Sequence, residues 1–170
     1  MNIKRGIVYW ITGLSGAGKT TVGTLLYEKI RAVKDNVVIL DGDALREVFG
    51  GDLGFTAEER LKSAGRNARL CRMLSDEGID VVCCTISMYD EIRDWNRKNI
   101  ENYREVYLKV SDEVLKQRNQ KGLYETSQNK LVGFGVKMEE PKNPDMVFVN
   151  DGGLSPEEIA QKILEPFSNI

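Results

Sequence analysis

The sequence predicts an α/β domain in which helices cover both faces of a mainly parallel, five-stranded sheet. Short apolar runs alternate along the chain with segments whose apolar residues repeat at helical spacing. The first run, "GIVYWIT" (6–12), is apolar almost throughout, as expected for a strand that is buried on both faces of a parallel sheet. Alternating strands and helices form a doubly wound sheet. We expect one domain over residues 1–170.

The strands are predicted by apolar runs with polar or glycine residues at their ends. These runs lie at residues 6–12, 36–40, 79–86, 105–110 and 146–149. The second run ends at "DGD" and so places two carboxylates at the carboxyl end of a strand. In open α/β sheets, ligands bind at that end of the strands.

The helices are predicted by apolar spacing and by capping residues. They are expected after a glycine-rich loop at 13–20, over about 57–77, 90–103 and 112–118, and along "SPEEIAQKILEPF" near the end of the chain. Val22, Leu25, Leu26 and Ile30 recur on one face of the first helix. Capping boxes begin two of the others, where Thr56 precedes Glu59 and Ser155 precedes Glu158 by three residues.

Residues 119–144 break this alternation, because they are polar, contain glycine and lack sustained periodicity. A segment of that length inside a compact domain is usually a functional loop or a disordered one.

Composition excludes several classes of function. The chain has 24 lysines and arginines against 26 aspartates and glutamates, so its net charge of −2 favours neither nucleic acid nor an anionic membrane as a partner. No apolar run approaches the ~20 residues of a membrane span. The start of the chain lacks signal-peptide architecture, and Cys71, Cys83 and Cys84 have neither disulfide-framework nor zinc-site spacing. We therefore expect a protein of the reduced cytoplasm.

The glycine-rich loop "GLSGAGKT" matches the phosphate-binding pattern G-x-x-x-x-G-K-[ST] between a strand and a helix. The alternative is a glycine-rich turn that matches by chance. Lys19 would reach the β- and γ-phosphates of ATP, and the Thr20 hydroxyl would bind Mg²⁺. The predicted ATP-binding residues are Gly13, Leu14, Ser15, Gly16, Ala17, Gly18, Lys19, Thr20 and Thr21. The chain lacks the D-x-x-G and N-K-x-D motifs of GTPases, which favours a small-molecule kinase.

The two carboxylates of "DGD" are candidates for the chemistry. Asp43 would accept the proton of an acceptor hydroxyl and hold a magnesium-bound water, since the chain has no histidine to serve as base. Arg46 would bind an acceptor phosphate. The alternative is that this stretch forms only a turn and a helix N-cap.

Six stretches together resemble one family over almost the whole chain: "WITGLSGAGKTT", "LDGDALR", "DLGFTAEER", "TISMYDEIR", "KGLY" and "EEPKNPD". They resemble the adenylyl-sulfate (APS) kinases, which phosphorylate the ribose 3′-hydroxyl of adenosine 5′-phosphosulfate. The resemblance implies a P-loop NTPase-type three-layer fold, a mobile lid at about 119–144, ATP and Mg²⁺ as cofactors, and a homodimer. It also implies that Phe55 stacks near the acceptor base.

The acceptor residues that the resemblance implies are Asp41, Arg46, Phe55, Arg60, Ser63, Arg66, Ile86, Ser87, Lys121, Leu131 and Phe134. Asp43 would be the base, Arg46 and Arg60 would lie by the 5′-phosphate, and Lys121 would belong to the lid. Ser87 would contact the acceptor, with helix capping as the alternative.

Departures from the family pattern cluster on the acceptor side. Ser63 replaces an asparagine, Gly65 an arginine and Met88 a proline, and in the lid Leu131 replaces the stacking phenylalanine, for which Phe134 is a candidate substitute. Loss of a single hydrogen-bonding group can change specificity. Cytidine diphosphoramidate kinases, which belong to capsule-modification pathways, are a branch of this family.

We therefore expect an ATP-dependent kinase that acts on the ribose 3′-hydroxyl of a 5′-modified nucleotide. Cytidine diphosphoramidate is favoured over APS as the acceptor. A non-catalytic nucleotide-binding module and a regulatory GTPase are the remaining alternatives.

Three aromatic residues and one charged stretch are expected to be structural. Tyr9, Trp10 and Tyr107 lie in predicted strands and are expected in the core. The charged stretch "YDEIRDWNRKNIENYRE" (89–105) is expected to be a solvated helix face, with a dimer contact as the alternative.

Overall fold

The computed structural model describes residues 4–118 and 138–165 and contains one five-stranded sheet. The strands are β1 (Val8–Thr12), β2 (Val37–Asp41), β3 (Asp80–Cys84), β4 (Tyr103–Lys109) and β5 (Met146–Val149). The helices are α1 (Lys19–Arg31), α2 (Gly42–Val48), α3 (Ala57–Asp76), α4 (Asp90–Asn99), α5 (Asp112–Arg118) and α6 (Pro156–Leu164). The strand order is β2-β3-β1-β4-β5 and every neighbouring pair is parallel, which confirms the predicted fold class.

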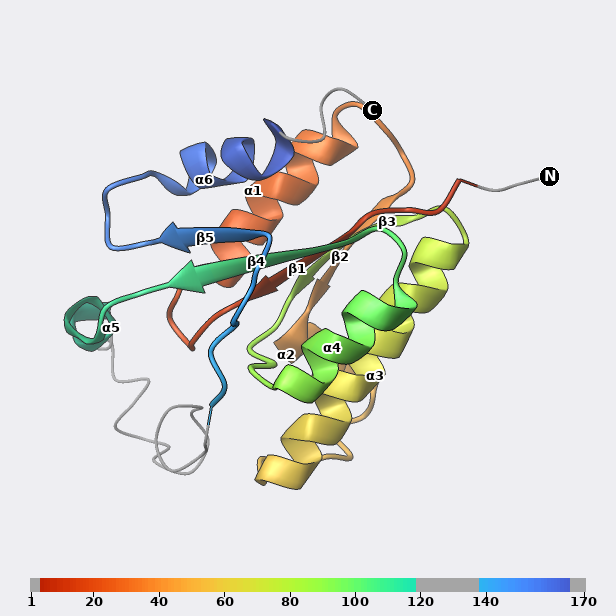
Figure 1. The fold of residues 1–170 in the computed structure, drawn as a ribbon, viewed down its shortest axis with the longest axis horizontal. Coiled ribbons are helices and arrows are strands. Elements are labelled where there is room, and N and C mark those ends of the chain that lie inside the picture. Colours follow the sequence, from red (N-terminus) through yellow and green to blue (C-terminus); the bar gives the residue numbers. More distant parts are fainter. Residues whose placement is uncertain (1–3, 119–137, 166–170) are drawn as a thin grey trace.

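Helices lie on both faces of the sheet, with α1 and α6 on one side and α3 and α4 on the other (Figure 1). Alternate residues of β1 serve the two sides, since Tyr9 and Ile11 pack in the α1–α6 layer while Val8 and Trp10 pack in the α3–α4 layer. Tyr9, Trp10 and Tyr107 are buried, as predicted. All five strands carry their carboxyl ends to one edge, where the loops that follow them meet.

The predicted capping boxes begin α3 and α6. Thr56 accepts from the Glu59 backbone and Ser155 from the Glu158 backbone, and each glutamate side chain bonds back to its N-cap residue. The predicted helix at 90–103 ends earlier, at Asn99, because Tyr103 already belongs to β4. The three cysteines are free and buried. In the described ranges no helix is both long and apolar enough to cross a membrane.

Gly23 brings α1 into close contact with β3. A Cβ at this position would lie 2.1 Å from the Cys84 sulfur. We expect Gly23→Ala to lower the free energy of unfolding by about 1–3 kcal/mol, because overpacking outweighs the better helix propensity of alanine. The matched control is Gly65→Ala in α3, where the nearest atom belongs to the flexible Arg69 side chain and the change should be neutral or stabilising. Urea unfolding compares the two variants, and equal stabilisation by both would contradict this packing.

Candidate active site

The phosphate-binding loop joins β1 to α1 and is shaped by glycines. Gly16 and Gly18 have φ of 80° and 89°, in the left-handed region that favours glycine. Gly18 is also the N-cap of α1, and a Cβ there would lie 2.7 Å from the Asn150 side-chain nitrogen. The Lys19 Nζ donates to the Leu14 carbonyl at 2.7 Å, so the lysine folds back over the loop. The loop therefore has the form that the sequence predicts for a phosphate cradle.

Lys19 lies in an environment that disfavours its charge. Burial lowers the pKa of Lys19 to about 8, although Cys84, Asp41 and Asp43 oppose this shift. A phosphate group beside the ammonium would reverse this effect, because an opposite charge favours the protonated form.

Asp41 and Asp43 take different roles at the end of β2. Asp41 caps α2, since its Oδ1 accepts from the Asp43 backbone N–H at 3.0 Å, and its Oδ2 accepts from the Thr20 hydroxyl at 2.7 Å. Asp41 is therefore the N-cap of α2, which is one part of what the alternative predicts. The exposed Asp43 side chain lines the cavity described next.

One cavity of about 760 Å³ joins the phosphate-binding loop to the predicted acceptor side. Its volume is in the range of small-molecule sites. The predicted site residues that line it are Ser15, Gly16, Gly18, Lys19, Thr20, Thr21, Asp41, Asp43, Arg46, Phe55, Arg60, Ser63, Ile86 and Ser87.

Other predicted residues do not line this cavity. Gly13 and Ala17 are buried beneath the loop, and Leu14 contributes its carbonyl to Lys19. Arg66 makes two hydrogen bonds to Asp52, at 2.8 and 2.7 Å. Its guanidinium is thus engaged outside the cavity. The predicted lid residues Lys121, Leu131 and Phe134 lie outside the described residues.

On the predicted acceptor side, two arginines contact Phe55. The guanidinium carbons of Arg46 and Arg60 lie 4.4 and 5.2 Å from the centre of its ring. Arg60 also donates to the Phe55 carbonyl at 2.8 Å, and Arg46 donates to the Gly54 carbonyl at 3.1 Å. Phe55 and the two cations thus form one cluster that lines the cavity, and the guanidinium groups suit an anionic group of a ligand.

Ser87 lies in a strained turn after β3. Its φ of 25° is the one positive value among the described non-glycine residues, and its buried Oγ lies 2.6 Å from the Thr85 Oγ1. The N-cap of α4 is Tyr89, without a side-chain hydrogen bond. The helix-capping alternative for Ser87 is therefore wrong. Backbone strain of this kind is concentrated at functional sites.

Sequence reasoning missed Arg118 and Asn150 on the loop side of the cavity. Arg118 donates to the carbonyls of Gly16 and Asn150, at 2.9 and 2.7 Å, and Asn150 donates to the Ala17 carbonyl at 2.8 Å. Both residues thus hold the phosphate-binding loop from β5 and α5. A signal was present for Asn150, which directly follows the apolar run 146–149, as Asp41 follows the second run.

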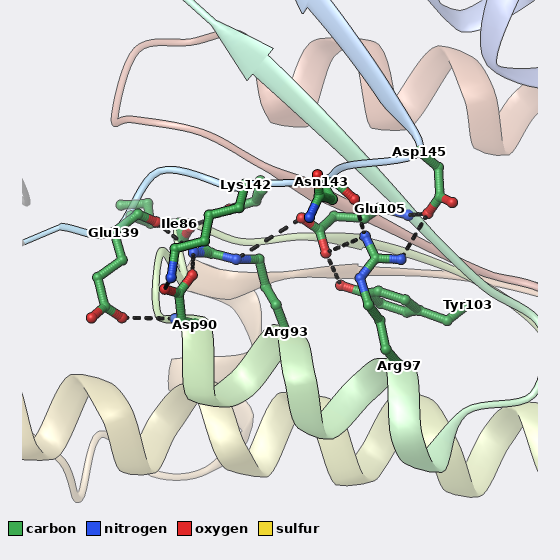
Figure 2. A network of polar contacts seen from close by, with 11 residues as sticks. Ile86, Asp90, Arg93, Arg97, Tyr103, Glu105, Glu139, Lys142, Asn143 and Asp145 are labelled. Carbon is green, nitrogen blue, oxygen red and sulfur yellow. Dashed lines mark hydrogen bonds and ion pairs between the residues drawn. The ribbon is translucent and has the colours of Figure 1, made fainter.

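The charged stretch 89–105 is a solvated helix face only in part: Glu91, Asp94 and Lys98 of α4 are exposed, as predicted, but the prediction was wrong for Arg93 and Glu105. Arg93 and Glu105 are buried, at 3% and 2% exposure, and their side chains point toward one another from α4 and β4 (Figure 2). Glu105 accepts from Arg97 at 3.1 Å and from the Tyr103 hydroxyl at 3.2 Å. Burial raises the pKa of Glu105, and the two arginines oppose this shift.

The same network holds the segment that precedes β5. Arg93 donates to the Glu139 carbonyl at 2.6 Å, and the Glu139 side chain accepts from the Asp90 backbone N–H at 2.7 Å (Figure 2). Arg97 donates to the Asn143 carbonyl at 2.7 Å. The neighbouring Met138 lines the cavity. The buried charges of α4 and β4 therefore fix one wall of the site.

Known proteins match this chain over most of its length. The family model described as adenylylsulphate kinase matches residues 5–149. A cytidine diphosphoramidate kinase of Campylobacter jejuni is 39% identical over 162 residues, covering 93% of this chain and 94% of that protein. A probable adenylyl-sulfate kinase of Archaeoglobus fulgidus is 39% identical over 148 residues, covering 85% and 96%.

A solved structure has the same fold. The Mycobacterium tuberculosis APS kinase CysC, in complex with AMPPNP and APS, superposes with a TM-score of 0.85 at 31% identity, covering 95% of this chain and 96% of that one. Family model, relatives and fold agree with the loop and cavity described above. The chain therefore belongs to the adenylylsulphate kinase family and is a P-loop kinase.

Proposed function

We propose that this kinase transfers the γ-phosphate of ATP to the ribose 3′-hydroxyl of a 5′-modified nucleotide, with cytidine diphosphoramidate as the acceptor. The observation that carries the proposal is the cavity of about 760 Å³. The phosphate-binding loop, Asp43, Phe55 and the two arginines that contact the Phe55 ring all line it. Two nucleotides can meet there with Asp43 between them.

The loop and two side chains would perform the transfer. Backbone N–H groups of the loop and the Lys19 ammonium would hold the ATP phosphates. Asp43 would accept the proton of the 3′-hydroxyl as that oxygen attacks the γ-phosphorus, and ADP would leave.

The residues present fit Mg²⁺. The Thr20 hydroxyl and the carboxylates of Asp41 and Asp43 are hard oxygen ligands, and Thr20 and Asp41 are already in contact. These groups would hold the ion, in part through water, and when bound it would neutralise charge on the phosphates.

The preference for cytidine diphosphoramidate is supported by where the departures from the family lie. Ser63 and Met88 line the cavity, while the phosphate-binding loop keeps every residue of its motif. The acceptor part of the site thus differs from the APS kinase pattern and the ATP part does not. APS is the second candidate acceptor, because relatives of both kinds are 39% identical to this chain, over 162 residues for the cytidine diphosphoramidate kinase and 148 for the probable adenylyl-sulfate kinase.

Parallel kinetics with the two acceptors tests the proposal. We expect ADP release to require an acceptor, and kcat/KM to be at least about tenfold higher for cytidine diphosphoramidate than for APS. The reverse preference would make the chain an APS kinase. ATP binding with no transfer to either nucleotide would leave a nucleotide-binding module and contradict the proposal.

Proton uptake should accompany ATP binding. Because burial lowers the pKa of Lys19 to about 8 and nearby phosphates raise it, binding should take up protons, and the uptake should increase between pH 7 and pH 8.5. Calorimetry with MgATP in two buffers of different ionisation enthalpy measures this uptake. In Lys19→Met, the proton uptake should no longer increase with pH. Equal uptake by wild type and this variant at pH 8.5 would contradict the role of Lys19.

A further inference from the structure

Asn67 lies on the cavity wall, on the side of α3 that faces the site. Arg60, Ser63, Ala64 and Asn67 all line the cavity, and their spacing of three, four and seven residues places them along one stripe of the helix. Asn67 is about 10 Å along the helix from Arg60. It therefore lies away from the Phe55 end of the cavity, beyond Ser63.

The Asn67 side chain has an unused hydrogen-bond acceptor. The residue is only 3% exposed, and its Oδ1 has no hydrogen-bond partner among the described residues. A buried polar atom without a partner is unfavourable and uncommon in native proteins. A ligand in the cavity that donates an N–H would satisfy it once the Asn67 side chain turns toward the cavity that this residue lines.

We propose that the Asn67 Oδ1 accepts a hydrogen bond from an N–H group of the acceptor nucleotide and so determines which acceptor is used. This inference rests on the proposed function. Two parts of the acceptor can supply the donor, namely the exocyclic amino group of its base and the amide nitrogen of a 5′-phosphoramidate. A sulfate end group offers only oxygen acceptors to Asn67, whereas a phosphoramidate offers an N–H.

Asn67→Leu removes the acceptor atom and keeps the approximate volume of the side chain. Binding is measured by calorimetry, with a non-hydrolysable ATP analogue present, for four nucleotides that combine cytidine or uridine with a 5′-diphosphoramidate or a plain 5′-diphosphate. Turnover of the same four is measured with ATP. If the wild-type enzyme prefers APS, the effect of the base amino group is measured instead by comparing adenosine 5′-phosphosulfate with inosine 5′-phosphosulfate.

We expect the wild type to lose about tenfold in affinity when the N–H that meets Asn67 is absent from the nucleotide, and Asn67→Leu to lose that discrimination. Collapse of the cytidine preference identifies the base amino group as the donor. Collapse of the phosphoramidate preference identifies the amide. Asn67→Ala gives the same comparison should the leucine variant not fold.

The control is Asn99→Leu on α4, which replaces a half-buried asparagine outside the cavity and should retain both preferences. The inference would be overturned if Asn67→Leu kept both the cytidine preference and the phosphoramidate preference. It would also be overturned if the variant lost affinity equally for all four nucleotides. A change in thermal stability with unchanged acceptor discrimination would show that Asn67 has only a structural role in α3, whose Ala64 and Ala68 belong to the core. Discrimination in binding without any turnover would contradict the proposed function and leave this inference standing.

Discussion

Asp43→Asn is expected to lower kcat by about 10²–10⁴-fold while MgATP affinity changes by no more than a few-fold. The variant keeps the shape of the side chain and its backbone N–H, which bonds to Asp41, but it cannot take a proton. Acceptor-dependent ADP release and calorimetric ATP binding measure the two effects.

No other described group of the cavity can readily replace Asp43 as the base. Both Asp41 oxygens accept hydrogen bonds, from the Asp43 backbone and from Thr20. Burial raises the pKa of the Cys84 thiol and of the Tyr89 hydroxyl, so both stay protonated near neutral pH. Lys19 is needed as a cation beside phosphate.

Asp52→Asn is the matched control for Asp43→Asn. Asp52 is exposed, pairs with Arg66 and does not line the cavity, so its replacement should leave kcat within about twofold. Near-normal turnover of Asp43→Asn would show that proton acceptance at this carboxylate does not drive transfer.

Glu105→Ala is expected to lower the free energy of unfolding by about 3–5 kcal/mol. The carboxylate is buried and accepts from Arg97 and Tyr103, with the buried Arg93 guanidinium 3.9 Å away. Its removal takes one of two carboxylates from the buried Arg93, which keeps Asp90, and removes the Glu105 acceptor of the buried Tyr103 hydroxyl. Glu105→Gln keeps hydrogen-bonding capacity at the site and should cost less than the alanine variant. Urea unfolding measures all three proteins.

Glu101→Ala tests whether burial is the cause of the large stability loss that we expect for Glu105→Ala. Glu101 also pairs with an arginine, Arg5 at 2.7 Å, but its side chain is 64% exposed. An exposed pair of this kind contributes about 0–1 kcal/mol. If Glu101→Ala and Glu105→Ala lowered the free energy of unfolding by similar amounts, the buried network would not be what supports residues 139–145.

Local patterns predicted the sheet and the long helices, because apolar periodicity and capping depend on residues that are close in sequence. The boxes at Thr56 and Ser155 are examples. The P-loop and the "DGD" carboxylates were also found this way, since each directly follows an apolar run in the sequence. Their strands, β1 and β2, lie on either side of β3, and the parallel arrangement brings both carboxyl ends to one edge of the sheet.

Pairings between distant residues could not be predicted in the same way. The stretch 89–105 looked solvated by composition, yet Arg93 is buried because a strand residue, Glu105, and the distant Glu139 pair with it. Asn67 gives no signal in the sequence, since its importance depends on the cavity and on a missing partner. Arg118 likewise contacts Gly16 across 102 positions of sequence.

The position of the transferred phosphate tests the central claim most directly. The enzyme is incubated with ATP, Mg²⁺ and the better of the two acceptors, and the product is examined by ¹H–³¹P correlation NMR. The account requires a new phosphorus signal that couples to the ribose H3′ proton, and this signal must fade in Asp43→Asn. A new phosphate on any other oxygen, or release of the γ-phosphate only as inorganic phosphate, would contradict it.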